Sequence, residues 1–139
     1  MSAEYPLLTE IAFPIRSYDT DFMGVVNNVV YVRWLSDLRH ELLASTVSLA
    51  ELMADGLGPA LTRTEVNYLR PIRLADRPVG RMWVTQLRRT SWRVAAEFRC
   101  GDQLMASAQQ AGCFIDLASL RPARVPAAMA TAYDAQRPE

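Results

Sequence analysis

An aspartate and two asparagines stand close together near the amino end of the chain, on either side of a glycine. The residues are Asp21, Gly24, Asn27 and Asn28, and an apolar helical pattern begins directly after them. The first N–H groups of a helix have no partner inside the helix, so they can donate hydrogen bonds to an outside group. A carboxylate beside such donors is suited to attack on a carbonyl, because the donors stabilise the oxyanion that develops. We therefore expect carbonyl chemistry at this helix start.

The elements that position these residues follow from the spacing of apolar side chains. We expect a strand over 8–16, in which Pro14 marks a sheet edge or a bulge, and then a polar turn over 17–28. A long helix is expected from about 29 to 44, because apolar side chains recur on one face; they are Tyr31, Trp34, Leu35, Leu38 and Leu42. On its polar face, Arg33 and Asp37 are spaced to form an ion pair.

The remaining chain is mostly strand-like. Ser48 and Glu51 predict a capping box for a short helix that ends at Gly56. Four strands are expected after it, over 57–69, 77–89, 92–100 and 103–117, the last two joined by a tight turn. The tail from about 121 is expected to be partly irregular, with a loose helix over 127–135 at most. This order predicts an α+β fold in which antiparallel strands wrap around the long helix, as one domain over 1–139.

The segment 18–35 resembles the signature of the hotdog-fold acyl-CoA thioesterases, in particular the 4-hydroxybenzoyl-CoA thioesterases of the DxD type. The matching residues are Asp19, Asp21, Gly24, Val25, Val26, Tyr31, Arg33, Trp34 and Leu35. The two asparagines and Tyr31 also resemble the His-Val-Asn-Asn-x-x-Tyr motif of long-chain acyl thioesterases, from which the chain departs at Val25, where the histidine would stand. Tyr68, Pro71 and Asp76 match a second family pattern. The resemblance implies a hotdog domain, a curved antiparallel sheet around a long central helix.

The resemblance also implies the roles of the central residues. Asp21 would act as general base on water or as nucleophile on the thioester carbon, whereas an aspartate that merely caps the helix is the structural alternative. The backbone N–H of Asn28 would polarise the carbonyl. Gly24 would allow close approach of the backbone or a positive φ. Asp19 would serve as a structural hydrogen-bonding residue.

Further residues are expected to bind substrate. Tyr31, Trp34 and Met23 would line an acyl pocket, and ordinary helix core is the alternative for Trp34. Asn27 would also contact substrate, with a helix cap as the alternative. Arg88 and Arg89 stand where relatives place basic residues near the phosphates of coenzyme A, and a solvated turn is the alternative.

The sequence lacks the residues that several other catalytic mechanisms require. His40 is the only histidine and stands late in the helix, and the chain has no Gly-x-Ser-x-Gly elbow, so a Ser-His-Asp hydrolase is not expected. All fifteen basic residues are arginine, which excludes a Schiff-base lysine. No group of histidines, cysteines and carboxylates has metal-ligand spacing, so neither a metal nor a cofactor is expected.

Composition narrows the partners and the compartment. The formal net charge of the 139 residues is zero, which gives nucleic-acid binding no electrostatic support. No apolar run is long enough to span a membrane, and no signal peptide is recognisable, so a cytoplasmic protein is expected. Cys100 and Cys113 are expected to be free thiols, because strand register places Cys100 opposite Gln103 and Cys113 near Thr90.

The functional expectation is hydrolysis of an acyl thioester, with acyl-CoA as the substrate. One alternative is an acyl-ACP thioesterase of fatty-acid or polyketide synthesis, and another is a non-catalytic acyl-CoA-binding protein on the same fold. The resemblance further implies a homodimer or homotetramer, because relatives complete the site across a dimer. The acyl group and the choice between base and nucleophile for Asp21 stay open.

Overall fold

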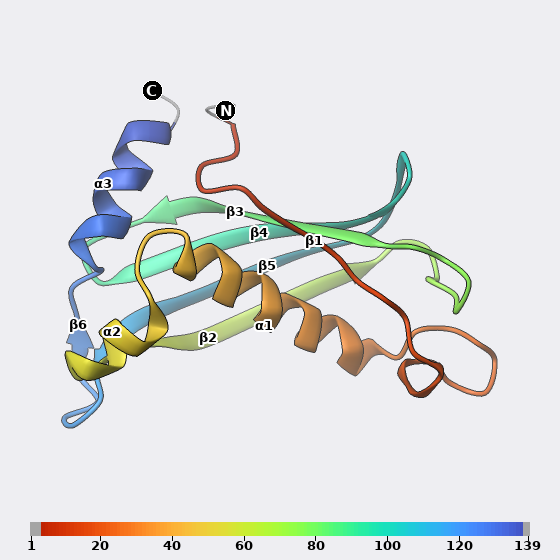
Figure 1. Cartoon of the computed structure of the whole chain (residues 1–139), viewed down its shortest axis with the longest axis horizontal. Helices are drawn as coiled ribbons and strands as arrows, with labels where there is room; N and C mark the ends of the chain where they lie inside the picture. The colour runs from red at the N-terminus through yellow and green to blue at the C-terminus, as the bar shows by residue number, and fades with distance from the viewer. Residues whose placement is uncertain (1–3, 138–139) are drawn as a thin grey trace.

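One antiparallel sheet forms the body of the computed structural model, which describes residues 4–137 (Figure 1). Its path follows the order β1-β3-β4-β5-β2, with the short β6 paired to β5. The strands are β1 (Thr9–Ala12), β2 (Leu57–Tyr68), β3 (Val79–Leu87), β4 (Ser91–Cys100), β5 (Gln103–Asp116) and β6 (Pro122–Ala123). The long strand β2 therefore stands at an edge of the sheet.

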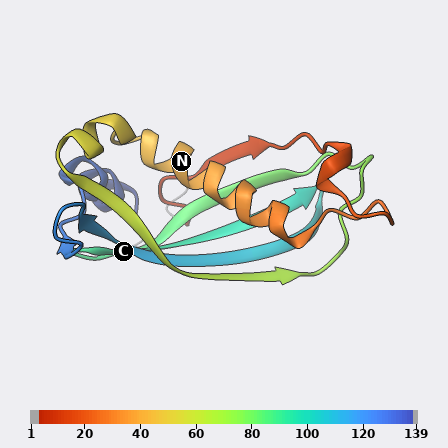
Figure 2. The same cartoon turned by 90° about the horizontal axis from the view of Figure 1, so that it is seen from below.

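The helix α1 (Asn28–Ala44) crosses the concave face of this sheet, as Figure 2 shows from below. Its apolar stripe lies against the strands, with Tyr31, Trp34, Leu35 and Leu38 at most 4% exposed. Aromatic rings fill the space under its first half, where Tyr31 meets Trp34, Phe98 and Tyr68 edge to face. The predicted α+β fold with a sheet around a long helix is confirmed.

The direction of α1 relative to β2 decides where its two ends lie. Tyr31, in the first turn of α1, contacts Tyr68 at the last residue of β2. The later half of α1 faces Pro59 and Leu61 near the beginning of β2, across a pocket described below. The helix therefore runs antiparallel to the edge strand, and its start lies at the end of β2.

Of the shorter elements, α2 agrees with the sequence-based prediction and β1 agrees with it only in part. The helix α2 (Leu49–Ala54) begins at Ser48, whose hydroxyl accepts the Glu51 N–H as predicted. The first strand is shorter than the predicted 8–16, because Pro14 has no N–H to continue the ladder beyond Phe13.

Two features of the tail correct the prediction. The strand β6 was not expected from the sequence, because a strand of only two residues has no readable alternation. The helix α3 (Ala127–Gln136) is a docked element and not a loose one, since Met129 and Tyr133 are buried.

Candidate active site

Asp21 begins a tight turn that ends at Val25. Its backbone N–H donates to the Val25 carbonyl, and the N–H of Gly24 donates to the Asp21 carbonyl. Gly24 has a φ of 76°, in the left-handed region that L side chains rarely adopt, so the predicted need for glycine is confirmed in its backbone.

The carboxylate of Asp21 is oriented by this turn. Oδ1 accepts the N–H of Met23 at 2.9 Å and the N–H of Val25 at 3.1 Å. Within residues 4–137 no hydrogen bond engages Oδ2, and the side chain is exposed. One carboxylate oxygen is thus fixed by the backbone, and the other is available to react.

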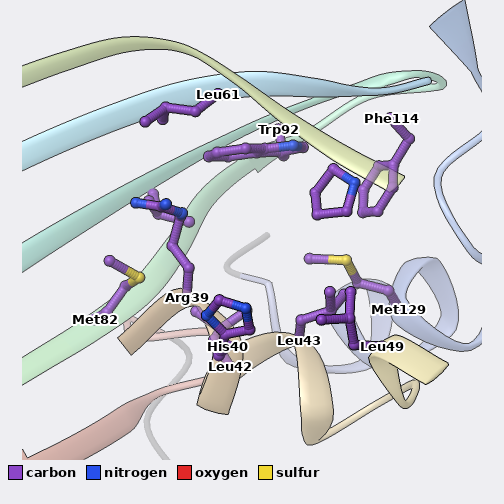
Figure 3. Close-up of a pocket in the computed structure, with 12 residues that line it drawn as sticks. Arg39, His40, Leu42, Leu43, Leu49, Leu61, Met82, Trp92, Phe114 and Met129 are labelled. Carbon is purple, nitrogen blue, oxygen red and sulfur yellow. The ribbon is translucent and has the colours of Figure 1, made fainter. Parts of the chain in front are cut away.

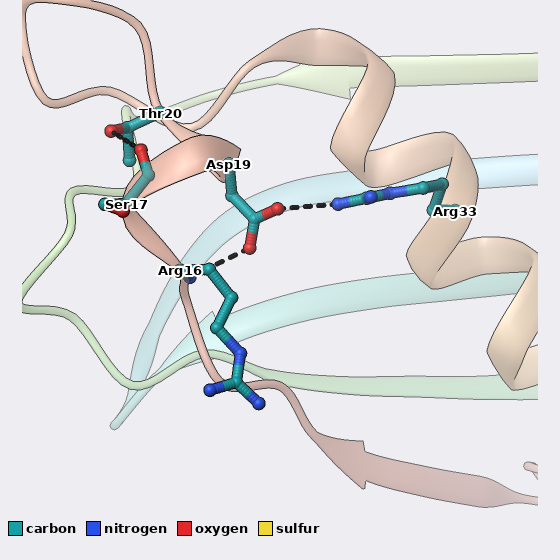
Figure 4. Close-up of polar contacts among 5 residues, drawn as sticks. All are labelled: Arg16, Ser17, Asp19, Thr20 and Arg33. Atoms are coloured by element: carbon teal, nitrogen blue, oxygen red, sulfur yellow. Dashed lines mark hydrogen bonds and ion pairs between the residues drawn. The ribbon is translucent and has the colours of Figure 1, made fainter.

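Asp19 anchors the segment that precedes the turn (Figure 4). It is 3% exposed, and its carboxylate accepts the Arg16 N–H through Oδ2 and Arg33 Nη2, at 2.6 Å, through Oδ1. Arg33 therefore pairs with Asp19. The ion pair between Arg33 and Asp37, which the helical spacing predicted, is wrong. The expected structural role of Asp19 agrees with these contacts, which tie the turn to α1.

The backbone just before the first turn of α1 is held by hydrogen bonds to two other segments. The Asn27 N–H donates to the Asp19 carbonyl, and the Val26 N–H donates to the Ile72 carbonyl. Asn27 is the N-cap residue, with φ −66° and ψ 145°, yet its side chain makes no capping hydrogen bond in the described structure. The helix start at Asn28 thus has no side-chain cap, which leaves donors there for an outside acceptor.

The other predicted binding residues near this turn differ in exposure. Met23 and the neighbouring Phe22 are 71% and 99% exposed, so they offer apolar surface beside Asp21. Tyr31 lies in the core at 2% exposed, and burial together with the nearby Tyr68 raises its pKa to about 12. In this structure Tyr31 is therefore a packing residue.

The structure does not bring Arg88 and Arg89 to the Asp21 turn of the same chain. They form the exposed turn between β3 and β4, at the end of the sheet near α3 in Figure 1. The Val125 N–H donates to the Arg89 carbonyl, which fixes this turn against the segment before α3. The Asp21 turn lies at the opposite end of the sheet.

A pocket of about 290 Å³ lies at the end of the sheet near the Arg88–Arg89 turn, between the later half of α1 and the sheet (Figure 3). Its wall is mostly apolar, with Leu42, Leu43 and Met129 on the helical side and Trp92 and Phe114 on the sheet side. Arg39 enters it from α1, where its Nη1 donates to Gln110 Oε1 at 2.6 Å. Burial lowers the pKa of Arg39 below its usual value.

Sequence reasoning missed this pocket, although one signal was present. Along β5 the inward positions read Ala106, Ala108, Gln110, Gly112 and Phe114, so a lone amide interrupts an otherwise small or apolar face. Gln110 is 2% exposed and links Arg39 to Thr64, whose Oγ1 accepts the Gln110 Nε2–H at 3.0 Å. A buried amide implies a polar partner on a facing element.

None of the helices in the described part of the chain combines the length and the apolar character that crossing a membrane requires. Between residues 4 and 137, no three histidine, cysteine or carboxylate side chains gather as a metal site would need. Cys100 and Cys113 are free thiols, as expected. Cys100 pairs with Gln103 in the strand register, and Cys113 pairs with Ser91, one residue beyond the expected Thr90.

Comparison with known proteins assigns the family. The model of the Thioesterase-like superfamily matches residues 15–133, which includes the Asp21 turn, α1 and all of β2 to β6. The chain belongs to the Thioesterase-like superfamily. A curated protein of similar sequence is an acyl-acyl carrier protein thioesterase of Arabidopsis thaliana, 33% identical over 69 residues. That match covers 49% of this chain and 36% of the Arabidopsis protein, so the chain spans about a third of the length of that relative.

Solved structures share the fold over nearly the whole chain. A thioesterase from Thermus thermophilus, complexed with coenzyme A and Zn, has a TM-score of 0.80 at 26% identity, over 97% of this chain and 98% of that one. A 1,4-dihydroxy-2-naphthoyl-CoA thioesterase from Synechocystis has a TM-score of 0.82 at 22% identity, over 91% and 96% of the two chains. The expected hotdog fold is confirmed.

Proposed function

We propose that this chain hydrolyses acyl thioesters and that Asp21 is its reacting group. One observation carries the proposal: a carboxylate with one oxygen fixed by two backbone N–H groups, and the other free, stands beside a helix start without a side-chain cap. Such an arrangement pairs an oriented base or nucleophile with oxyanion donors. Membership of the Thioesterase-like superfamily supports the same chemistry.

The reaction follows from these two parts. The thioester carbonyl oxygen accepts a hydrogen bond from the Asn28 N–H, where the helix dipole favours the negative charge that develops. Asp21 Oδ2 either removes a proton from the attacking water or attacks the carbon directly, giving a mixed anhydride that water then hydrolyses. In both routes the C–S bond breaks, and the thiolate leaves and takes up a proton. Gly24 keeps the turn open to the substrate, since it carries no side chain.

Acyl-CoA is the substrate class that we favour. The thioesterase from Thermus thermophilus, at 26% identity, was solved with coenzyme A, which supports this choice. Arg88 and Arg89 form an exposed cationic turn of the kind that binds phosphate groups. We propose that this turn contacts the nucleotide end of the substrate.

A carrier-linked acyl group is the second candidate, and a specific observation favours it. The curated relatives of similar sequence are acyl-acyl carrier protein thioesterases of Arabidopsis thaliana. The two substrate classes share the phosphopantetheine thioester, so the same Asp21 chemistry serves both. They differ in whether a nucleotide or an acidic protein follows the phosphate.

Release of free thiol from matched substrates tests the function. The panel pairs acetyl to palmitoyl and benzoyl-type groups, each on coenzyme A and on a carrier protein. We expect hydrolysis, with higher kcat/KM for the coenzyme A series. Preference for the carrier series would select the second candidate. Acyl-CoA binding without thiol release from any member would instead identify a non-catalytic binding protein.

We propose further that two copies of the chain complete the site. Apolar side chains gather unburied around the Asp21 turn, and they are Tyr18, Phe22, Met23, Val29, Leu69 and Leu74. The twelve-residue edge strand β2 also carries exposed side chains over most of its length. Long edge strands and exposed apolar patches both favour association with another copy.

A symmetric pairing along β2 would bring the separated parts of the site together. Two copies related by a two-fold axis pair their β2 strands antiparallel, so the beginning of one β2 lies beside the end of the other. The Asp21 turn lies at the end of β2, whereas the pocket and the Arg88–Arg89 turn lie near its beginning. Each Asp21 would then face the pocket of the second copy.

Light scattering during chromatography tests the assembly. We expect a particle of at least twice the 15.6 kDa chain mass, as a dimer or a tetramer. A fully active monomer would contradict a shared site. For the compartment, we propose the cytoplasm, and the two free cysteines are consistent with a reducing environment.

A further inference from the structure

Arg39 is a half-buried cation that faces an apolar pocket without a counter-charge. Its one hydrogen bond goes to the neutral Gln110, and none of the ion pairs among residues 4–137 includes it. Of the described residues that line the pocket, none is a carboxylate. Removing a guanidinium from water is costly unless an anion or several acceptors replace the water. The residues of the pocket thus supply no anion for Arg39, and an anionic group of a ligand could fill that place.

Trp92 forms part of the sheet side of the same pocket. The side chain is 5% exposed, and its buried Nε1–H has no acceptor among the described residues. Figure 3 shows the guanidinium of Arg39 near one end of the indole, while the ring nitrogen lies at the other end, toward Phe114. A Cβ at Gly112 would collide with this indole, so the ring is held flat against the sheet. The ring nitrogen has almost no exposed surface, so the polar side chains of the described lining that face the cavity are Arg39 and His40.

The pocket is closed off from the Asp21 turn of its own chain. Arg39 lies eleven residues after Asn28 on α1, about 17 Å along the helix axis. Trp34, Leu35 and Leu38 pack against the sheet between the two places. The lining residues Pro59 and Leu61 are exposed at the β2 edge, where the pocket reaches the surface. A ligand thus enters from the side on which a second copy would place its own Asp21 turn.

We propose that this pocket binds the distal end of the acyl group and selects acyl groups that end in a carboxylate. The carboxylate would pair with Arg39, and the acyl carbons would lie against the Trp92 ring and the leucine and methionine side chains. The volume of about 290 Å³ is at the small end for ligand pockets, so an acyl group of modest size fits. This inference rests on the proposed thioester hydrolysis and names its substrate class.

The test compares acyl-CoA pairs that differ only at the distal end. Butanedioyl-, hexanedioyl- and octanedioyl-CoA are each measured against the butanoyl, hexanoyl or octanoyl analogue. The readout is the ratio of the two kcat/KM values for each pair. We expect a ratio of about 10 to 100 in favour of the dioyl substrate at the best length, the scale of hydrogen bonds to a charged group. Ratios near one, with neutral acyl-CoAs still hydrolysed, would overturn this inference and leave the proposed function intact.

Variants assign the preference to Arg39. Arg39→Met should abolish the preference, and Arg39→Lys should keep part of it. Arg93→Met is the matched control, because Arg93 is exposed on the opposite face of β4, and it should leave the ratio unchanged.

Two results with Arg39→Met would contradict the proposal. An equal loss of kcat/KM for both members of a pair would show that Arg39 binds the coenzyme A moiety. Dissociation of the assembly in light scattering, with the substrate ratio unchanged, would show that Arg39 pairs with a carboxylate of the second copy. Binding of free octanedioate and octanoate, measured by calorimetry, provides a readout that does not depend on turnover.

Discussion

At the scale of residues, Asp19 and Asp21 are alike in sequence and opposite in environment. Asp19 is buried, and both its oxygens accept hydrogen bonds, whereas Asp21 is exposed and has one oxygen free. A carboxylate with both oxygens engaged is a poor base or nucleophile, because its lone pairs are already used. The structure therefore separates an anchoring aspartate from the one that we propose to react, although the sequence pattern shows two identical side chains.

Asp19→Ala tests this separation. It removes the acceptor for the Arg16 N–H and for Arg33, and we expect it to lower the free energy of unfolding by about 1–3 kcal/mol. Since Arg33 is largely exposed, its ion pair contributes little of this loss. Urea denaturation measures the stability, and kcat on the best acyl-CoA should fall less than about 10-fold. Unchanged stability with turnover as low as in an Asp21 variant would make Asp19 the reacting group.

At the scale of elements, the first half of α1 is held by its aromatic contacts. Tyr31 touches Trp34, Tyr68 and Phe98, and so joins the helix start to β2 and β4. Its position fixes where the first-turn N–H groups point. Tyr31 thus influences the proposed oxyanion donors without contact to the reacting atoms.

The alkaline stability of the protein should depend on Tyr31. Its folded pKa of about 12 lies above the ordinary value of 10.0, so the unfolded chain releases this proton at lower pH than the folded chain. The stabilisation is fully present below pH 10.0 and declines as pH rises toward 12, by up to about 1.4 kcal/mol per pH unit. Tyr31→Phe should flatten this decline in thermal unfolding measured from pH 9 to about 12. An unaltered slope would show that Tyr31 ionises equally in both states.

The elements were predictable where their signals are local. The apolar stripe of α1, the Ser48 cap and the hairpin at Gly101 each depend on a few neighbouring residues, and all three are confirmed. The strand β6 and the docking of α3 depend on contacts with distant residues, which leave no periodic trace. The same holds at the site: the Asp21 turn was readable from the sequence, whereas the pairing of Arg39 with Gln110 joins residues 71 positions apart.

At the scale of the whole molecule, the separation of the Asp21 turn from the pocket leads to a complementation experiment. Asp21→Asn removes the proposed reacting group, and Leu61→Arg places a charged side chain at the mouth of the pocket on the exposed β2 edge. We expect each variant alone to have little activity. Co-expression should restore about a quarter of wild-type activity, because half of random dimers are mixed and each mixed dimer has one intact site.

The complementation has a clear contrary outcome. If each chain formed its own complete site, the co-expressed variants would be no more active than the two variants measured separately. Light scattering on Leu61→Arg serves as the control, because the variant must still form the assembly for the comparison to be valid.

The most direct measurement is turnover of the best acyl-CoA by Asp21→Asn beside Asp37→Asn. Both changes remove one exposed carboxylate charge within or next to α1, but only Asp21 stands at the turn with the fixed oxygen. We predict that Asp21→Asn lowers kcat by about 10²–10⁴-fold, the usual scale for a group that transfers a proton, and that Asp37→Asn leaves it unchanged. Undiminished hydrolysis by a folded Asp21→Asn protein would contradict the assignment of Asp21.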